Sequence, residues 1–186
     1  NGVTNQWNFY VFTNAFVESS LVGITNGTNV AFVTFITPNL SQSRVFEADV
    51  DLYVSKDPRL TNLAPAVLNS TNPNVLLKSV TRGGTETIVL SNALPTDVFY
   101  VGVKSEDHQG AEFSLITIST DLPFEEDVNG RKRLLGFPIT AVIPDGTPND
   151  PAAATLMAIG LSANRVQRVV VDSVIHHENM GDLFGI

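Results

Sequence analysis

Alternation of apolar and polar residues over short segments is the feature that most constrains the fold of this chain. Successive side chains of a β-strand point to opposite faces, so a period of two predicts a strand. In the segment 50–54, Val50, Leu52 and Val54 share one face, and Asp51 and Tyr53 share the other. Six segments of this kind are predicted to be strands: 7–12, 30–36, 50–54, 85–90, 98–103 and 113–118.

Turn-forming residues separate these segments. Asn26-Gly27, Asp57-Pro58 and Arg82-Gly83-Gly84 are examples, and residues of these types favour tight turns. Short strands alternating with such turns are typical of a sandwich. We therefore predict an all-β fold that begins with an antiparallel, jelly-roll-like β-sandwich and contains almost no helix. The side chains predicted to lie inside it are Leu52, Val54, Val101 and Val103.

The strand pattern breaks between residues 121 and 136. Pro123, the acidic triplet 125–127 and the basic triplet 131–133 lie there, and mixed charges of this kind indicate a solvated linker. The predicted organisation is a sandwich over residues 1–120, a linker over 121–136 and a partial second β-sandwich module over 137–186.

Three further strands are predicted in the second module. They cover residues 137–142, 153–159 and 166–175, and a short helix over 152–161 is the alternative to the middle one. The last strand is apolar on both faces, which is typical of a strand inside a structure. Downstream sequence, the first sandwich or a strand of a neighbouring copy of the chain could cover it, and we expect one of the last two.

Composition narrows the class of protein. The chain has 186 residues, of which 43% are hydrophobic, and its net charge of −8 argues against binding a nucleic-acid backbone. There is no cysteine, which excludes disulfides and thiolate metal sites. No apolar run reaches the roughly 18 residues of a membrane helix. The chain begins without methionine and ends in an apolar run, so we expect a piece of a longer exported protein.

The first part of the chain resembles the bacterial pre-peptidase C-terminal domain, a β-sandwich appended to secreted peptidases and other exported proteins. The resemblance covers residues 7–120. It departs from the family at residues 59–79, where a shorter loop is usual. The matching pieces are DVDLYV at 49–54, ETIVL at 86–90, FYVGV at 99–103 and FSL at 113–115.

The last part of the chain resembles the first half of a P/homo B domain, the jelly-roll module that follows the catalytic domain of kexin-like convertases. The resemblance covers residues 137–186. The matching pieces are IPD at 143–145, VVVDSVIH at 169–176 and GDL at 181–183. Both families are accessory modules without catalytic residues, so the resemblance implies binding, stabilisation or anchoring at the cell surface or outside the cell.

Acidic residues around the third predicted strand are the first candidate site. Asp49 and Asp51 share a face about 7 Å apart, and Glu47 and Asp57 flank them. Carboxylate oxygens are ligands that Ca²⁺ prefers. The sequence therefore predicts calcium at Asp49, Asp51 and Asp57, and a solvent-facing strand edge is the alternative.

Two more polar groups are weaker candidates. Glu106, Asp107 and His108 lie in a predicted hairpin loop, which is polar whatever its function. A second metal site is predicted at Asp145 and Asp182, in an acidic set completed by Asn149, Asp150 and Asp172. His176 and His177 are adjacent in a predicted strand, so they point to opposite faces and favour a structural role.

Aromatic residues supply the remaining candidates. Most of them belong in the core, but rings on an exposed face form a platform for a sugar or a protein. Trp7 and Tyr53 are the predicted ligand-binding residues. No nucleophile motif or phosphate-binding loop is present.

We therefore expect a non-catalytic module of a secreted or cell-surface bacterial protein that binds polysaccharide, matrix protein or envelope. The alternatives are a structural subunit of an extracellular fibre or surface assembly, and a stabilising or pro-region of a secreted peptidase.

Overall fold

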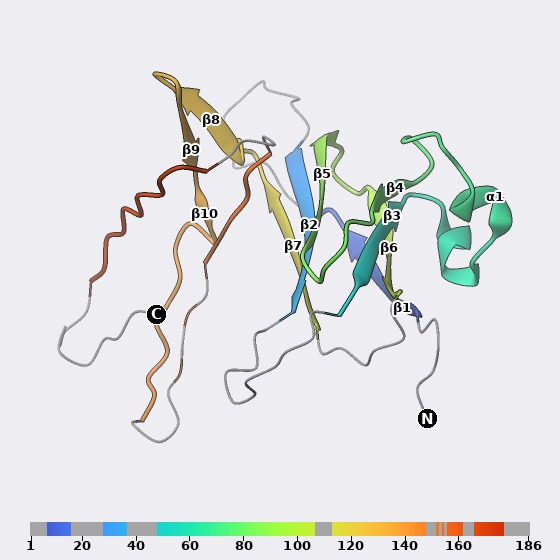
Figure 1. The fold of residues 1–186 in the computed structure, drawn as a ribbon, viewed down its shortest axis with the longest axis horizontal. Helices are drawn as coiled ribbons and strands as arrows, with labels where there is room; N and C mark the ends of the chain where they lie inside the picture. Colours follow the sequence, from blue (N-terminus) through green and yellow to red (C-terminus); the bar gives the residue numbers. More distant parts are fainter. Residues whose placement is uncertain are drawn as a thin grey trace.

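Antiparallel β-strands are the main secondary structure of the computed structural model, shown in Figure 1. The structure describes residues 7–15, 28–36, 48–106, 113–147, 152, 154, 156–161 and 166–176. The strands of the first half are β1 (Trp7–Thr13), β2 (Thr28–Ile36), β3 (Val50–Ser55), β4 (Leu77–Ser79), β5 (Glu86–Ala93), β6 (Val98–Ser105) and β7 (Phe113–Thr120). They are followed by β8 (Glu125–Val128), β9 (Arg131–Leu134), β10 (Gly136–Phe137) and β11 (Met157–Ala158).

Two sheets form the sandwich. Sheet A has the strand order β1-β6-β3-β4, and sheet B has the order β5-β2-β7. All pairings within them are antiparallel. The six strands predicted before residue 120 are all present, and the antiparallel all-β sandwich is confirmed. The structure adds β4, which lies within the 59–79 insertion.

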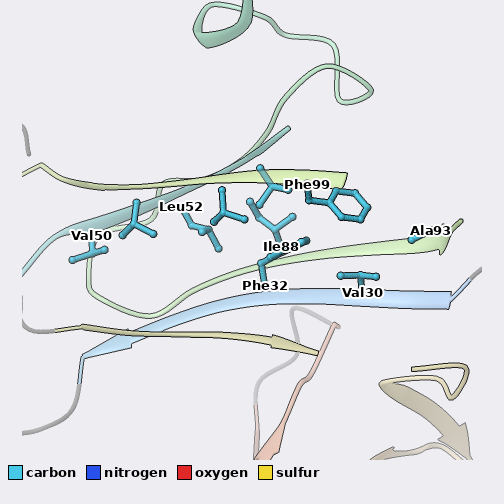
Figure 2. Close-up of a cluster of buried hydrophobic side chains, with 10 residues drawn as sticks. Val30, Phe32, Val50, Leu52, Ile88, Ala93 and Phe99 are labelled. Atoms are coloured by element: carbon cyan, nitrogen blue, oxygen red, sulfur yellow. The ribbon is translucent and has the colours of Figure 1, made fainter. Parts of the chain in front are cut away.

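Apolar side chains from both sheets meet between them. Figure 2 shows Leu52 of β3, Phe32 of β2 and Phe99 of β6 filling this space, and all three are fully buried. The four side chains predicted to lie inside are between 0% and 2% exposed, which confirms the predicted inward face. Burial of this layer is the main favourable contribution to folding.

The insertion covers the outer face of sheet A. It forms a 3₁₀ turn η1 (Pro58–Asn62) and a short helix α1 (Pro65–Leu68), on the side of sheet A away from sheet B (Figure 1). The Asp57 carboxylate begins η1, since it accepts a hydrogen bond from the backbone N–H of Arg59 at 2.9 Å. Leu60 and Val67 are fully buried against Tyr53.

The outer face of sheet B is covered by residues that follow the sandwich. Phe124, Phe137 and Ile159 are 2–5% exposed and pack against Ala31 and Val33 of β2. Strand β2 is therefore buried on both faces. In Figure 1, β8, β9 and β10 lie on this side of sheet B, away from sheet A.

The segment 121–136, predicted to be a solvated linker, is folded. Strands β8 and β9 form a hairpin, and its turn residues Asn129 and Gly130 have φ angles of 55° and 74°. Positive φ at both central residues is the signature of the turn that Asn-Gly favours. The charges that suggested a linker pair with one another across the hairpin, as Lys132 does with Glu125 at 3.1 Å.

The end of the chain differs most from expectation. The strand predicted over 166–175 is wrong, because the structure has no strand in residues 166–176. The strand predicted over 137–142 is reduced to β10, which pairs with β11. The alternative helix over 152–161 is absent from the part of that range that the structure describes. Within the described ranges, no helix is long and apolar enough to cross a membrane.

Candidate functional site

Strand register places several of the candidate residues side by side on the outer face of sheet A. Trp7 of β1 lies opposite Lys104 of β6, and Lys104 in turn lies opposite Asp51 of β3. Tyr53 is two residues from Asp51 and therefore shares its face. The structure thus brings together the aromatic and the acidic candidates, which the sequence presented as separate sites.

Trp7 is partly exposed and rests on other rings. It stacks on Phe9 with 5.6 Å between ring centroids, and it contacts Tyr53 at 4.9 Å. A Cβ atom on Gly102 would come within 2.9 Å of the Trp7 ring, so this position of β6 needs glycine. The Lys104 ammonium lies 6.0 Å from the centroid of the Trp7 ring. Tyr53 is only 9% exposed, so its ring faces neighbours rather than solvent.

Asp51 is held among polar groups and is 4% exposed. Its Oδ2 accepts a hydrogen bond from the Tyr53 hydroxyl at 3.3 Å. Burial, followed by a hydrogen bond and charge repulsion from Glu106, raises the pKa of Asp51 to about 6. The same burial, together with the Asp51 charge, raises the pKa of Tyr53 above its usual range. Asp51 therefore binds a proton at a higher pH than an ordinary aspartate does.

Asp49 and Glu106 complete the acidic group. The Asp49 Oδ1 accepts a hydrogen bond from the Gly83 N–H at 3.1 Å, and its carbonyl accepts one from the Glu106 N–H at 2.9 Å. Glu106 also forms an ion pair with Lys104. An open hollow of about 480 Å³ lies here, lined by Asp49, Asp51, Tyr53, Lys78, Val80 and Glu106.

Asp57 does not join this group. It follows the opposite end of β3, where its carboxylate binds Arg59 through Nη2 at 2.7 Å. These hydrogen bonds from Arg59 hold the pKa of Asp57 below its usual range. The three acidic residues predicted to share one calcium ion are thus divided between two ends of a strand.

The second predicted metal site is only partly described. Asp145 and Asp172 of this acidic set are exposed, and its other members, Asn149, Asp150 and Asp182, lie outside the described residues. Of the two histidines, His176 is exposed and His177 lies outside the described residues. Asp107 and His108 of the hairpin loop also lie outside them.

Calcium binding remains a prediction from the sequence. Within the part of the chain that the structure describes, no group of three or more His, Cys, Asp or Glu side chains is arranged to hold a metal ion. Asp49, Asp51 and Glu106 are the carboxylates that come nearest to a calcium site, because they gather around one hollow.

Two lysines of the site were not singled out in the sequence. Lys104 follows Gly102 at a spacing of two, which places it on the face of Tyr100 rather than on the core face of Val103. The alternation in the sequence therefore already indicates that Lys104 lies on the outer face of sheet A. Lys78 lies in β4 opposite Tyr53, and only the pairing of strands brings it to the hollow.

No protein-family model matches the chain, and neither a curated protein nor a solved structure matches it. The resemblances to the pre-peptidase C-terminal domain and to the P/homo B domain therefore remain predictions from the sequence.

Proposed function

We propose that this chain is a non-catalytic accessory module of a secreted or cell-surface bacterial protein, and that it binds extracellular polysaccharide. The observation that carries the proposal is the row formed by Trp7, Lys104 and Asp51 across three strands of sheet A. The hollow beside this row is open to solvent, which suits a ligand longer than the site. The resemblance to two families of exported accessory modules is consistent with it.

The residues of the row suit a ligand rich in hydroxyl groups. A partly exposed ring such as that of Trp7 offers a flat apolar face with large contact area. Carboxylate oxygens at Asp51 and Glu106 accept hydrogen bonds, and the amines of Lys78 and Lys104 donate them. A few polar groups converging beside an apolar surface are the usual composition of a ligand site.

The arrangement of the carboxyl groups favours binding over glycoside cleavage. Glycosidases hold their two carboxyl groups roughly 5–9.5 Å apart, so that the sugar carbon or a water molecule fits between them. Asp51 and Glu106 are hydrogen-bonded to each other. Two carboxyl groups joined by a hydrogen bond stand closer together than this spacing, so the pair does not match the glycosidase arrangement.

The test is binding of the full chain to a panel of soluble polysaccharides by affinity electrophoresis, followed by titration calorimetry. We expect Trp7→Ala to weaken binding at least about tenfold, which corresponds to about 1.4 kcal/mol. Tyr10→Ala is the matched control, because Tyr10 is 41% exposed on the same strand but points to the other face. Equal binding by the Trp7→Ala variant and the unmodified chain would contradict the proposed site.

A second candidate function is a subunit of an extracellular fibre or surface assembly. It is favoured by the valines of residues 166–174, which are 65–87% exposed. Exposed apolar patches are characteristic of surfaces that bind other proteins. Light scattering over a range of protein concentrations decides this candidate, since a fibre subunit grows in mass with concentration and a monomeric module does not.

A further inference from the structure

A buried carboxylate lies where the chain passes from sheet A to sheet B. Glu86 is the first residue of β5 and is 1% exposed. Its carboxylate accepts a hydrogen bond from the Thr81 hydroxyl at 2.6 Å and a second one from the Ser79 hydroxyl of β4. Both donors are neutral, so among the residues that the structure describes the side-chain partners of the Glu86 carboxylate are hydroxyl groups.

A second buried polar group lies beside it. Thr34 of β2 is directly opposite Glu86 in the β2–β5 register, and paired side chains of neighbouring strands lie on one face with Cβ atoms about 5 Å apart. Thr34 is fully buried, and its hydroxyl has no hydrogen-bond partner among the residues that the structure describes. An unsatisfied buried hydroxyl destabilises the folded state, so such groups normally have a partner.

Charge decides what kind of partner fits this group. Glu86 forms no ion pair with any described lysine, arginine or histidine. A buried carboxylate without an opposite charge is strongly unfavourable. A bound cation supplies that charge, and every side chain in the group offers an oxygen, which is the ligand of hard cations.

The number of negative charges in the group decides between a monovalent and a divalent cation. One carboxylate and three hydroxyl groups carry a single negative charge, which a monovalent ion neutralises. A divalent ion would leave one positive charge buried. We propose that Glu86, Thr34, Ser79 and Thr81 form a site for a monovalent hard cation such as Na⁺ at the corner between the two sheets, with Glu86 and Thr34 buried and Thr81 at its exposed rim.

The test measures thermal unfolding of the full chain in NaCl and in choline chloride at the same ionic strength. Binding to the native state raises its melting temperature, so we expect a higher, saturable midpoint in NaCl. Glu86→Gln should lose the Na⁺-dependent rise, and Thr34→Val should lose most of it. Thr87→Val is the matched control, because Thr87 is exposed on the other face of β5 and should keep the full rise.

Two results overturn the proposal. One is an equal midpoint in the two salts for the unmodified chain. The other is a Thr34→Val variant that is more stable than the unmodified chain and keeps the full Na⁺-dependent rise. That outcome would show that the Thr34 hydroxyl is an unsatisfied group, since replacing such a group by an apolar one of the same shape is neutral or stabilising. The Thr34→Val comparison is independent of whether Glu86→Gln folds.

Discussion

Strand β2 and the segment 166–175 have the same sequence character but different surroundings. Both are rich in β-branched residues and carry apolar side chains on both faces. In β2, Val30, Ala31 and Phe32 are fully buried, while Val171 and Val174 of the later segment are 82% and 87% exposed. The difference lies in the neighbours. Strand β2 has β5 and β7 at its edges and core clusters on both faces.

This comparison shows that a doubly apolar segment needs partners on four sides. Two strands satisfy its backbone, and two layers cover its side chains. The 166–175 segment has no strand partner within the described ranges, and its valines are exposed. Apolar pattern alone therefore predicts the tendency to be covered rather than the cover itself.

The largest expected effect is on β2. Phe32→Ala should lower the free energy of unfolding by about 3–5 kcal/mol, because it removes a fully buried ring and leaves a cavity. Val171→Ala should change it by less than about 0.5 kcal/mol, as for exposed positions generally. Urea denaturation measures both. A loss above 1 kcal/mol for Val171→Ala would show that the segment is covered in solution and would remove the contrast.

The next effect concerns the layer that covers the second face of β2. Phe124→Ala should lower the free energy of unfolding by about 3 kcal/mol, at the lower end of the range for buried rings, since its cover is thin. The ring is 2% exposed and lies 5.3 Å from that of Phe137. Chemical denaturation with intrinsic fluorescence checks this. The control Leu134→Ala, at a side chain that is 39% exposed, should cost much less.

If Phe124→Ala has no effect, residues 121–136 behave as the solvated linker that their charges suggested. The covering layer would then contribute nothing to the stability of the sandwich.

The smallest effect concerns Asp51 of β3, the other strand buried along its length. Its pKa is raised from 3.8 to about 6 in the folded chain, so ionisation is less favourable in the folded than in the unfolded state. The free energy of unfolding should therefore fall as the pH rises from about 4 to 7. The shift corresponds to about 3 kcal/mol at most, and solvent screening at the open hollow reduces this to about 1–2 kcal/mol.

Thermal unfolding between pH 4 and 8 tests this dependence. Asp51→Asn should flatten the curve over that range, because the amide does not ionise. Asp145→Asn, at an exposed position in the later part of the chain, should leave the curve unchanged. If the melting temperature of both variants changes with pH in the same way, groups other than Asp51 cause the pH dependence.

The candidate site was predicted as separate parts. Trp7, Asp49 and Asp51 were each identified from residue type and face, and the structure places them around one surface. Glu106 was given a loop role, yet it hydrogen-bonds to Asp51. Asp57 was grouped with Asp51 because it is close in sequence, but a strand separates residues along its length by about 3.3 Å each.

The sequence by itself determined the strands of the sandwich other than β4, and which of their residues point inward. Alternation is a local property of each strand, so Leu52 and Val101 could be assigned to the core without knowing their neighbours. The hydrophobic clusters on the outer faces of sheets A and B could not be predicted from alternation. Tyr53 and Ala31 pack in clusters with residues that follow them by many positions, such as Leu76 and Phe124.

Only the tertiary structure decided which strands are neighbours. The row of Trp7, Lys104 and Asp51 joins residues almost a hundred positions apart in the chain, and the pairing of Thr34 with Glu86 joins two strands far apart in sequence. Cross-strand pairs arise from the order and register of strands, which depend on the summed packing of both sheets. No single segment contains that information.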